Sequence, residues 1–103
     1  MKGGVTMAKY ITLIRWTQKG MENIKESPAR LDRAREAVQA AGGEIKAFYL
    51  TIGQYDAVTI NKAPSEEAYA VTLLAIAAAG AVRTETLRAF TEEEYRKIIA
   101  ALP

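Results

Sequence analysis

The chain has 103 residues, of which half are hydrophobic and a quarter charged, and its formal net charge is +2. This length suits one domain with a single modest core, and the balance is ordinary for a globular protein. The chain contains neither cysteine nor histidine, which excludes disulfides, thiol nucleophiles, and catalysis by Ser-His-Asp or Cys-His groups. Acid–base chemistry would therefore fall to Asp, Glu, Lys or Tyr.

The composition also sets expectations about partners, cofactors and location. The arginines of segment 30–36 alternate with Asp32 and Glu36, as on a solvated helix face, so no nucleic-acid partner is expected. The most apolar window, residues 68–82, is shorter than the roughly 20 residues that span a bilayer, so no membrane partner is expected. Without cysteine or histidine no metal or cofactor is expected, and the composition fits a reducing cytoplasm.

The expected elements begin after a short leader. Residues 1–8 lack an apolar stretch, so we interpret them as a disordered or extended leader to a single domain over residues 9–103. Residues 10–16, YITLIRW, are rich in β-branched and aromatic residues and predict a strand. Residues 17–20 predict a polar turn, and residues 21–26 a single helical turn.

Ser27 followed by Pro28 predicts a helix start capped by the serine, and Gly42-Gly43 predicts its end. Between them, apolar residues recur at helical spacing at Leu31, Ala34, Val38 and Ala41.

Two strands are then predicted, over residues 44–52 and 55–61, joined at Gly53-Gln54 as a tight antiparallel hairpin. Ser65 predicts the cap of a second helix that runs to about Ala79.

Residues 82–90 predict a fourth strand. Thr91 and Glu94 form a capping-box pattern at the start of a terminal helix, which is expected to turn Tyr95, Ile98 and Ile99 inward.

This order, β-α-β-β-α-β-α, predicts an α+β, ferredoxin-like fold with a four-stranded antiparallel sheet of order 4-1-3-2. Both faces of that sheet are apolar. The first strand places Tyr10, Ile14 and Trp16 on one face and Ile11 and Leu13 on the other. The second strand is expected to place Phe48, Leu50 and Ile52 on one face and Ile45, Ala47 and Tyr49 on the other.

Two helices cover only one sheet face, so we expect the other to pack against a second copy of the chain, as a dimer or higher homo-oligomer. The alternative is that tyrosine and threonine make this face polar enough to remain exposed to solvent. The second helix, apolar nearly all round, is a further expected contact surface.

The predicted strand order gathers polar and aromatic residues at one end of the sheet, beneath a possible lid at residues 17–20. One interpretation is a binding pocket, in which aromatic walls and an arginine hold a small carboxylate or enolate. Asp56 would be its proton acceptor and Tyr55 its hydrogen-bond donor. The candidate ligand-binding residues are Arg15, Trp16, Tyr49, Tyr55, Asp56, Arg83, Thr84 and Glu85.

The alternative interpretation of the same residues is structural. Asp56 would then bond backbone N–H groups and fix the hairpin. Arg15–Asp56 and Arg83–Glu85 would be surface ion pairs, and Trp16 and Tyr55 would be core or interface aromatics.

Several motifs of this chain resemble the GYD domain family, and together they extend from about Lys9 to Phe90. The family signature is Gly-Tyr-Asp, and here Gln54 separates the glycine from Tyr55-Asp56. The matching residues are Trp16-Thr17, Gly20, Asn23-Ile24, Ser27-Pro28, Arg30, Phe48-Tyr49-Leu50-Thr51, Gly53-Gln54-Tyr55-Asp56 and Val82-Arg83-Thr84-Glu85-Thr86.

The resemblance implies a small prokaryotic protein with a ferredoxin-like fold of the dimeric α/β-barrel type, and it implies no activity. We therefore expect an oligomeric module that binds a small molecule or a partner protein. The alternative is a cofactor-free isomerase or monooxygenase-like enzyme that uses Asp56 and Tyr55 with Arg15 or Arg83.

Overall fold

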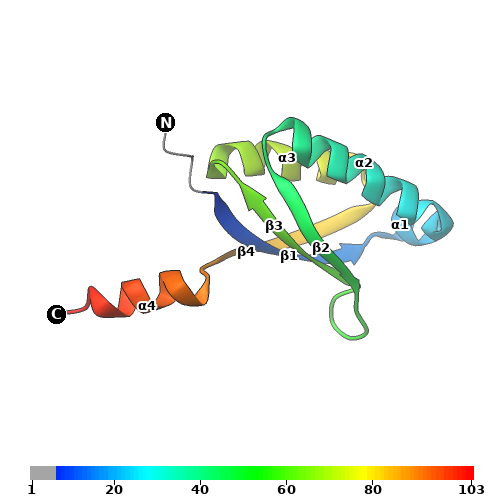
Figure 1. Cartoon of the computed structure of the whole chain (residues 1–103). Coiled ribbons are helices and arrows are strands. Elements are labelled where there is room, and N and C mark those ends of the chain that lie inside the picture. The colour runs from blue at the N-terminus through cyan, green and yellow to red at the C-terminus, as the bar shows by residue number, and fades with distance from the viewer. Residues whose placement is uncertain (1–6) are drawn as a thin grey trace.

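The structure, a computed structural model, describes residues 7–103, so most of the expected leader lies outside the described residues. It forms one four-stranded sheet and its helices (Figure 1). In chain order the elements are β1 (Ala8–Trp16), α1 (Gln18–Glu22), the 3₁₀ turn η1 (Ile24–Glu26), α2 (Ser27–Ala40), β2 (Glu44–Leu50), β3 (Ala57–Ala63), α3 (Glu66–Ala78), β4 (Val82–Ala89) and α4 (Glu92–Ala100).

The sheet has the order β2-β3-β1-β4, and every neighbouring pair is antiparallel. This confirms the predicted ferredoxin-like α+β fold. Helices α2 and α3 lie together on one face of the sheet (Figure 1). The other face, here called the outer face, has two rows of paired residues at its centre. They are Ala47–Ile60–Ile11–Leu87 and Tyr49–Val58–Leu13–Glu85.

The segment between β1 and α2 is more helical than predicted. Helix α1 begins inside the expected polar turn, because the Thr17 hydroxyl accepts the Gly20 N–H at 3.1 Å and caps the first turn. Pro28 lies in the first turn of α2 as expected, but Ser27 is already helical. The N-cap is Glu26, which makes no side-chain capping bond. The predicted serine cap is therefore wrong, since η1 leads directly into α2.

A β-bulge changes which residues of β2 face the helices. The register of β2 against β3 shifts between Ile45 and Ala47, which places Lys46 out of step. Ile45 is consequently buried under α2 together with the Phe48 side of the strand, and not on the face of Ala47 and Tyr49 as predicted.

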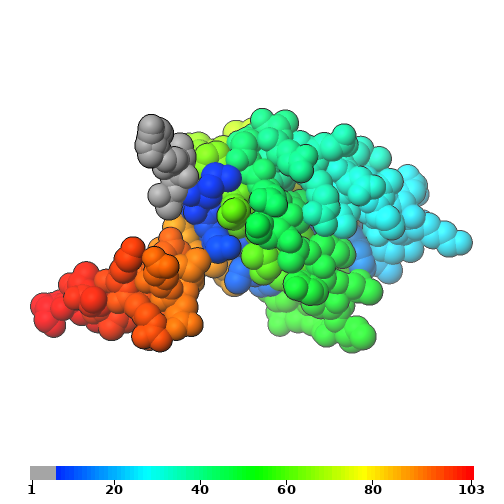
Figure 2. Space-filling model, viewed as in Figure 1, coloured from blue at the N-terminus to red at the C-terminus, as the bar shows by residue number. Residues whose placement is uncertain are grey.

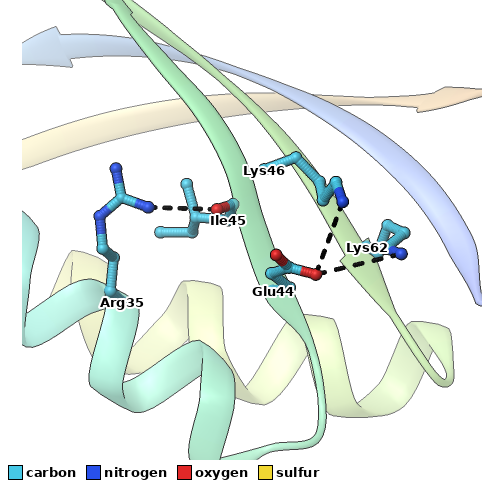
Figure 3. Close-up of polar contacts among 5 residues, drawn as sticks. All are labelled: Arg35, Glu44, Ile45, Lys46 and Lys62. Atoms are coloured by element: carbon cyan, nitrogen blue, oxygen red, sulfur yellow. Dashed lines mark hydrogen bonds and ion pairs between the residues drawn. The ribbon is translucent and has the colours of Figure 1, made fainter.

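Contacts on both sides of the sheet secure this bulge. From α2, Arg35 donates to the Ile45 carbonyl at 3.1 Å, while Glu44 pairs with Lys46 and Lys62 at 3.8 and 4.0 Å (Figure 3). The guanidinium thus holds α2 on the strand at the point where the strand is irregular.

The loop between β2 and β3 is longer than the predicted two-residue turn. Strand β2 ends at Leu50 and β3 begins at Ala57, so residues 51–56 form the connection. Thr51 closes the loop, since its N–H donates to the Asp56 carbonyl at 2.9 Å and its hydroxyl to the Tyr55 carbonyl at 2.6 Å. Gly53 adopts a φ of +142°, and Ile52 at the tip is fully exposed.

The core lies between the sheet and the two helices, and it is small and partly polar. Its buried apolar members are Tyr10, Val38, Ile45, Ala57, Ala63, Tyr69 and Ala81, three of which are alanines. Tyr10 and Tyr69 stack with their ring centroids 4.5 Å apart. Four polar residues, Thr12, Thr59, Asn61 and Thr72, are buried beside them.

Helix α4 extends away from the body of the molecule (Figures 1 and 2). The predicted capping box of Thr91 and Glu94 is present, but Tyr95, Ile98 and Ile99 are exposed. Their predicted inward packing is therefore wrong within one chain. The radius of gyration is 15.2 Å, against about 13 Å for a compact domain of this length. The projecting helix accounts for this difference, because no other element within residues 7–103 packs against it.

Candidate functional site

The strand register brings the predicted site residues to one end of the sheet. Arg15 pairs with Arg83, Ile14 with Thr84 and Leu13 with Glu85. On the other side of β1, the Asp56 N–H donates to the Ile14 carbonyl at 2.8 Å. Alternation along the strands nevertheless divides this set of residues between the two faces of the sheet.

A polar corner formed by Arg15, Tyr55, Arg83 and Glu85 lies on the outer face. The Arg15 guanidinium stands over the Tyr55 ring, 4.8 Å from its centroid. The Tyr55 hydroxyl donates to Glu85 Oε1 at 2.7 Å. This hydrogen bond raises the pKa of Tyr55 above its ordinary value of 10.0, and burial and the Glu85 charge raise it further, while Arg15 opposes them. The phenol is therefore protonated near neutral pH.

Asp56 has a structural role at the end of the hairpin loop. Its Oδ2 accepts the backbone N–H of Trp16 at 2.9 Å, while its own N–H and carbonyl bond the backbones of Ile14 and Thr51. The carboxylate thus joins the loop to β1 in the way that the structural interpretation expected. The ion pairs predicted between Arg15 and Asp56 and between Arg83 and Glu85 are absent from the described residues, so that part of the structural interpretation is wrong. The Arg15 guanidinium makes a cation–π contact with Tyr55 instead.

Trp16 and Thr84 lie on the opposite face, toward the helices, where they line a cavity. Tyr49 is on the outer face and 58% exposed, and Val58 and Leu13 separate it from Glu85. The structure therefore brings together four of the eight predicted ligand-binding residues in the polar corner. Asp56 lies at the end of the loop that precedes β3, and Tyr49 lies farther along the outer face. Trp16 and Thr84 lie on the opposite face of the sheet.

The segment expected to act as a lid, residues 17–20, is packed down. The Thr17 N–H donates to the Ala81 carbonyl at 3.0 Å, and Lys19 Nζ to the Ala79 carbonyl at 3.1 Å. Gly20 is buried so closely that an added Cβ would lie 2.1 Å from the Ala81 oxygen. These contacts hold the segment against the turn between α3 and β4.

The cavity between α2, α3 and the sheet has a volume of about 300 Å³. Its floor carries Thr12, Thr59 and Asn61, and Tyr69 reaches it from α3. The sequence reading missed these residues. The signal was available in Thr12, Thr59 and Asn61, which alternate in phase with the apolar residues of the helix-facing side of β1 and β3.

The polar corner offers two guanidinium groups, one phenol and one carboxylate at the surface; the guanidinium groups suit an anion, whereas the phenol already donates to the carboxylate. Within residues 7–103, no three Asp, Glu, His or Cys side chains gather as a metal ion would require. No helix in this described part of the chain has the length and apolarity needed to cross a membrane.

Comparisons with solved structures support the fold. The leucine response regulatory protein of Mycobacterium tuberculosis superposes with a TM-score of 0.62 at 19% identity, over 82% of this chain. The feast or famine regulatory protein of M. tuberculosis, solved with L-methionine, gives the same score and identity. This chain spans about half the length of each, and at that identity the likeness establishes the fold alone.

Sequence comparison establishes the family. A Thermus thermophilus protein, described as a glutamine synthetase and cystathionine beta-lyase binding protein, is 30% identical over 84 residues. The matched region covers 81% of this chain and 88% of that relative. The model of the GYD domain matches residues 10–99, as the resemblance of the motifs implied. The chain belongs to the GYD domain family.

Proposed function

We propose that the protein is an oligomeric binding module, which holds a small molecule or a partner protein and acts by binding rather than by catalysis. The observation that carries this proposal is the apolar outer face. Its two rows combine the partly buried Ile11, Leu13, Val58 and Ile60 with the more exposed Tyr49 and Leu87. A contiguous apolar surface of this kind marks an interaction site, because monomers rarely leave one in water.

A second copy of the chain is the occupant we propose for the outer face. The buried core of one chain is small and rich in alanine, so burial against a partner would add the apolar contacts that one chain lacks. Pairing two outer faces across a two-fold axis would also enclose the polar corner, in which Tyr55 donates to Glu85. The family resemblance, which implies a fold of the dimeric α/β-barrel type, favours self-association in general.

Helix α4 supports the same proposal. Its apolar residues Tyr95, Ile98 and Ile99 are exposed, as is Leu102 just beyond its end, and the helix projects beyond the body of its own chain (Figure 2). An amphipathic helix presented in this way suits an apolar groove on another chain.

Size-exclusion chromatography with light scattering tests the assembly. We expect the wild type to have at least twice the mass of one 11.3 kDa chain. Leu13→Lys, at the centre of the outer face, should shift it toward the monomer, because it places charges against each other at the interface. Met21→Lys, at an exposed position of α1 outside the two rows, is the matched control. A wild-type monomer at micromolar concentration would overturn the proposal.

For the partner, the proposal rests on the T. thermophilus relative, whose description names two enzymes that it binds. Titration calorimetry with glutamine synthetase and with cystathionine beta-lyase, both from this chain's own source organism, tests whether this chain shares that property. We also propose that the protein is located in the cytoplasm, which its cysteine-free composition favours. Absence of binding to both enzymes would overturn the proposal of a shared partner.

A further inference from the structure

The cavity between α2, α3 and the sheet contains a hydrogen-bonding group with no partner. Asn61 is 2% exposed. Its amide nitrogen, which has two N–H donors, lies within hydrogen-bond distance of three oxygens: Thr59 Oγ1 at 2.9 Å, Thr12 Oγ1 at 3.2 Å and the Tyr69 hydroxyl at 2.5 Å. Its Oδ1 is buried, and no group among residues 7–103 pairs with it. Buried polar atoms are nearly always paired, so a water molecule or a ligand group is the expected partner of this oxygen.

Reversing the amide does not remove the requirement. The polar cluster of Thr12, Thr59 and Tyr69 lies at one end of the amide. Exchanging oxygen and nitrogen would therefore leave an N–H in place of the oxygen without a partner. A hydroxyl satisfies either orientation, because it both donates and accepts. The polar end of the cavity is thus suited to a hydroxyl group.

The other end of the cavity is cationic. Arg30, near the start of α2, donates to the Gly20 carbonyl at 3.3 Å and to the Asn23 carbonyl at 2.9 Å. A guanidinium has five N–H donors, so Arg30 retains donors for an anion. Arg33, one turn further along α2, also lines the cavity.

Between these ends the cavity is apolar and elongated. Its walls include Ile14, Leu31, Ala34, Phe48, Leu73 and Ile76. Along β3 the floor runs from Asn61 to Ala57, a distance of about 13 Å at the rise of a strand. The volume of about 300 Å³ is at the lower limit of small-molecule sites.

We propose that this cavity binds a compact carboxylic acid with an apolar body and a terminal hydroxyl. The hydroxyl pairs with the Asn61 amide, the body lies between α2 and α3, and the carboxylate meets Arg30 and Arg33. This inference rests on the small-molecule part of the proposed function and is independent of self-association, because the cavity and the outer face lie on opposite sides of the sheet.

The test uses 3-(4-hydroxyphenyl)propionate as the probe and calorimetry as the measurement. Trp16 lines the cavity and is the only tryptophan of the chain, so its fluorescence gives a second readout. We expect 3-phenylpropionate, which lacks the hydroxyl, to bind about tenfold more weakly. We expect a similar loss for 4-ethylphenol, which lacks the carboxylate. Equal affinity for all three molecules, or no binding of the probe, would overturn the proposal.

Two variants of α2 locate the site. Ala34→Leu adds three carbon atoms inside the cavity and should abolish probe binding while the thermal midpoint is kept or raised. Ala40→Leu, on the exposed side of the same helix and outside the cavity lining, should bind the probe like the wild type. If Ala34→Leu binds the probe as well as Ala40→Leu does, the proposed site is wrong.

The oligomeric mass of the same samples separates the two proposals. Loss of probe binding in Ala34→Leu with an unchanged mass would support the cavity and leave assembly unaffected. A wild-type chain that forms oligomers but does not bind the probe would overturn the cavity proposal alone. A monomeric wild type that binds the probe would overturn the assembly proposal alone.

Discussion

The carboxylate of Asp56 accepts the backbone N–H of Trp16 at 2.9 Å. Trp16 is the last residue of β1, and Asp56 immediately precedes β3. The bond therefore continues the pairing of these two strands beyond the point where their backbone ladder ends. A hydrogen bond to an ionised acceptor contributes more to stability than a neutral one.

We expect Asp56→Ala to lower the free energy of unfolding by about 1–2 kcal/mol, because the Trp16 N–H loses its acceptor. Asp56→Asn keeps an acceptor oxygen and should lose less than about 1 kcal/mol. Urea denaturation measures both. Asp32→Ala, on the exposed surface of α2, is the control and should remain within about 0.5 kcal/mol of the wild type. Equal stability of Asp56→Ala and Asp32→Ala would contradict the structural role.

Among the glycines of residues 7–103, Gly20 has the least space for a side chain. A Cβ there would lie 2.1 Å from the Ala81 carbonyl oxygen, which is backbone and has little freedom to move. We expect Gly20→Ala to lower the free energy of unfolding by about 1–3 kcal/mol, the range for overpacked sites. Met21→Ala, at the exposed neighbouring position, should have little effect. Thermal unfolding distinguishes the two, and a stable Gly20→Ala would show that α1 lies further from β4.

The Tyr55–Glu85 hydrogen bond predicts a titration. The Glu85 carboxylate accepts a hydrogen bond from the phenol and repels the phenolate, so Glu85→Gln should lower the pKa of Tyr55 toward its ordinary value. Because the folded pKa is raised, this contribution to stability is complete below pH 10 and is lost as the pH rises through the folded pKa.

Nuclear magnetic resonance of tyrosine labelled at ¹³Cζ measures the Tyr55 pKa directly, and Tyr55→Phe assigns its signal. An unchanged pKa in Glu85→Gln would mean that the two side chains do not meet in solution.

The capping box of α4 predicts a response to acid. Glu94 accepts the Thr91 N–H at 2.8 Å, and this bond lowers the pKa of its carboxyl below 4.5. Its contribution is therefore present above pH 4.5 and is lost as the pH falls through the lower folded value. We expect the first turn of α4 to fray under those conditions, as seen by amide chemical shifts.

Glu94→Gln is the matched variant, because glutamine also satisfies the capping box but does not titrate. Its α4 amides should lack the acid transition. The same acid fraying in Glu94→Gln as in the wild type would assign the effect to another group.

The residues of the predicted site lie on both faces of the sheet, because the prediction grouped residues that are neighbours in the chain. Arg15 and Trp16 are neighbours in the chain, yet one joins Tyr55 on the outer face and the other lines the cavity. Alternation along β1 had already placed these two neighbours on opposite faces. The prediction grouped them by their common position at the end of the strand, and closeness along the sheet does not place side chains on the same face.

Local patterns by themselves determined the strands, the two long helices, their order and the capping box, because hydrophobic periodicity and capping residues act within a few positions. Only the tertiary structure decided that the bulge at Lys46 turns Ile45 inward, that the carboxylate of Asp56 reaches the backbone of Trp16, and that α4 leaves the body. Each of these three features depends on contacts between different elements. Such contacts join residues far apart in the sequence and do not change the hydrophobic periodicity of either segment. The unpaired Asn61 oxygen belongs to the same class, since it became visible only when α2 and α3 enclosed it.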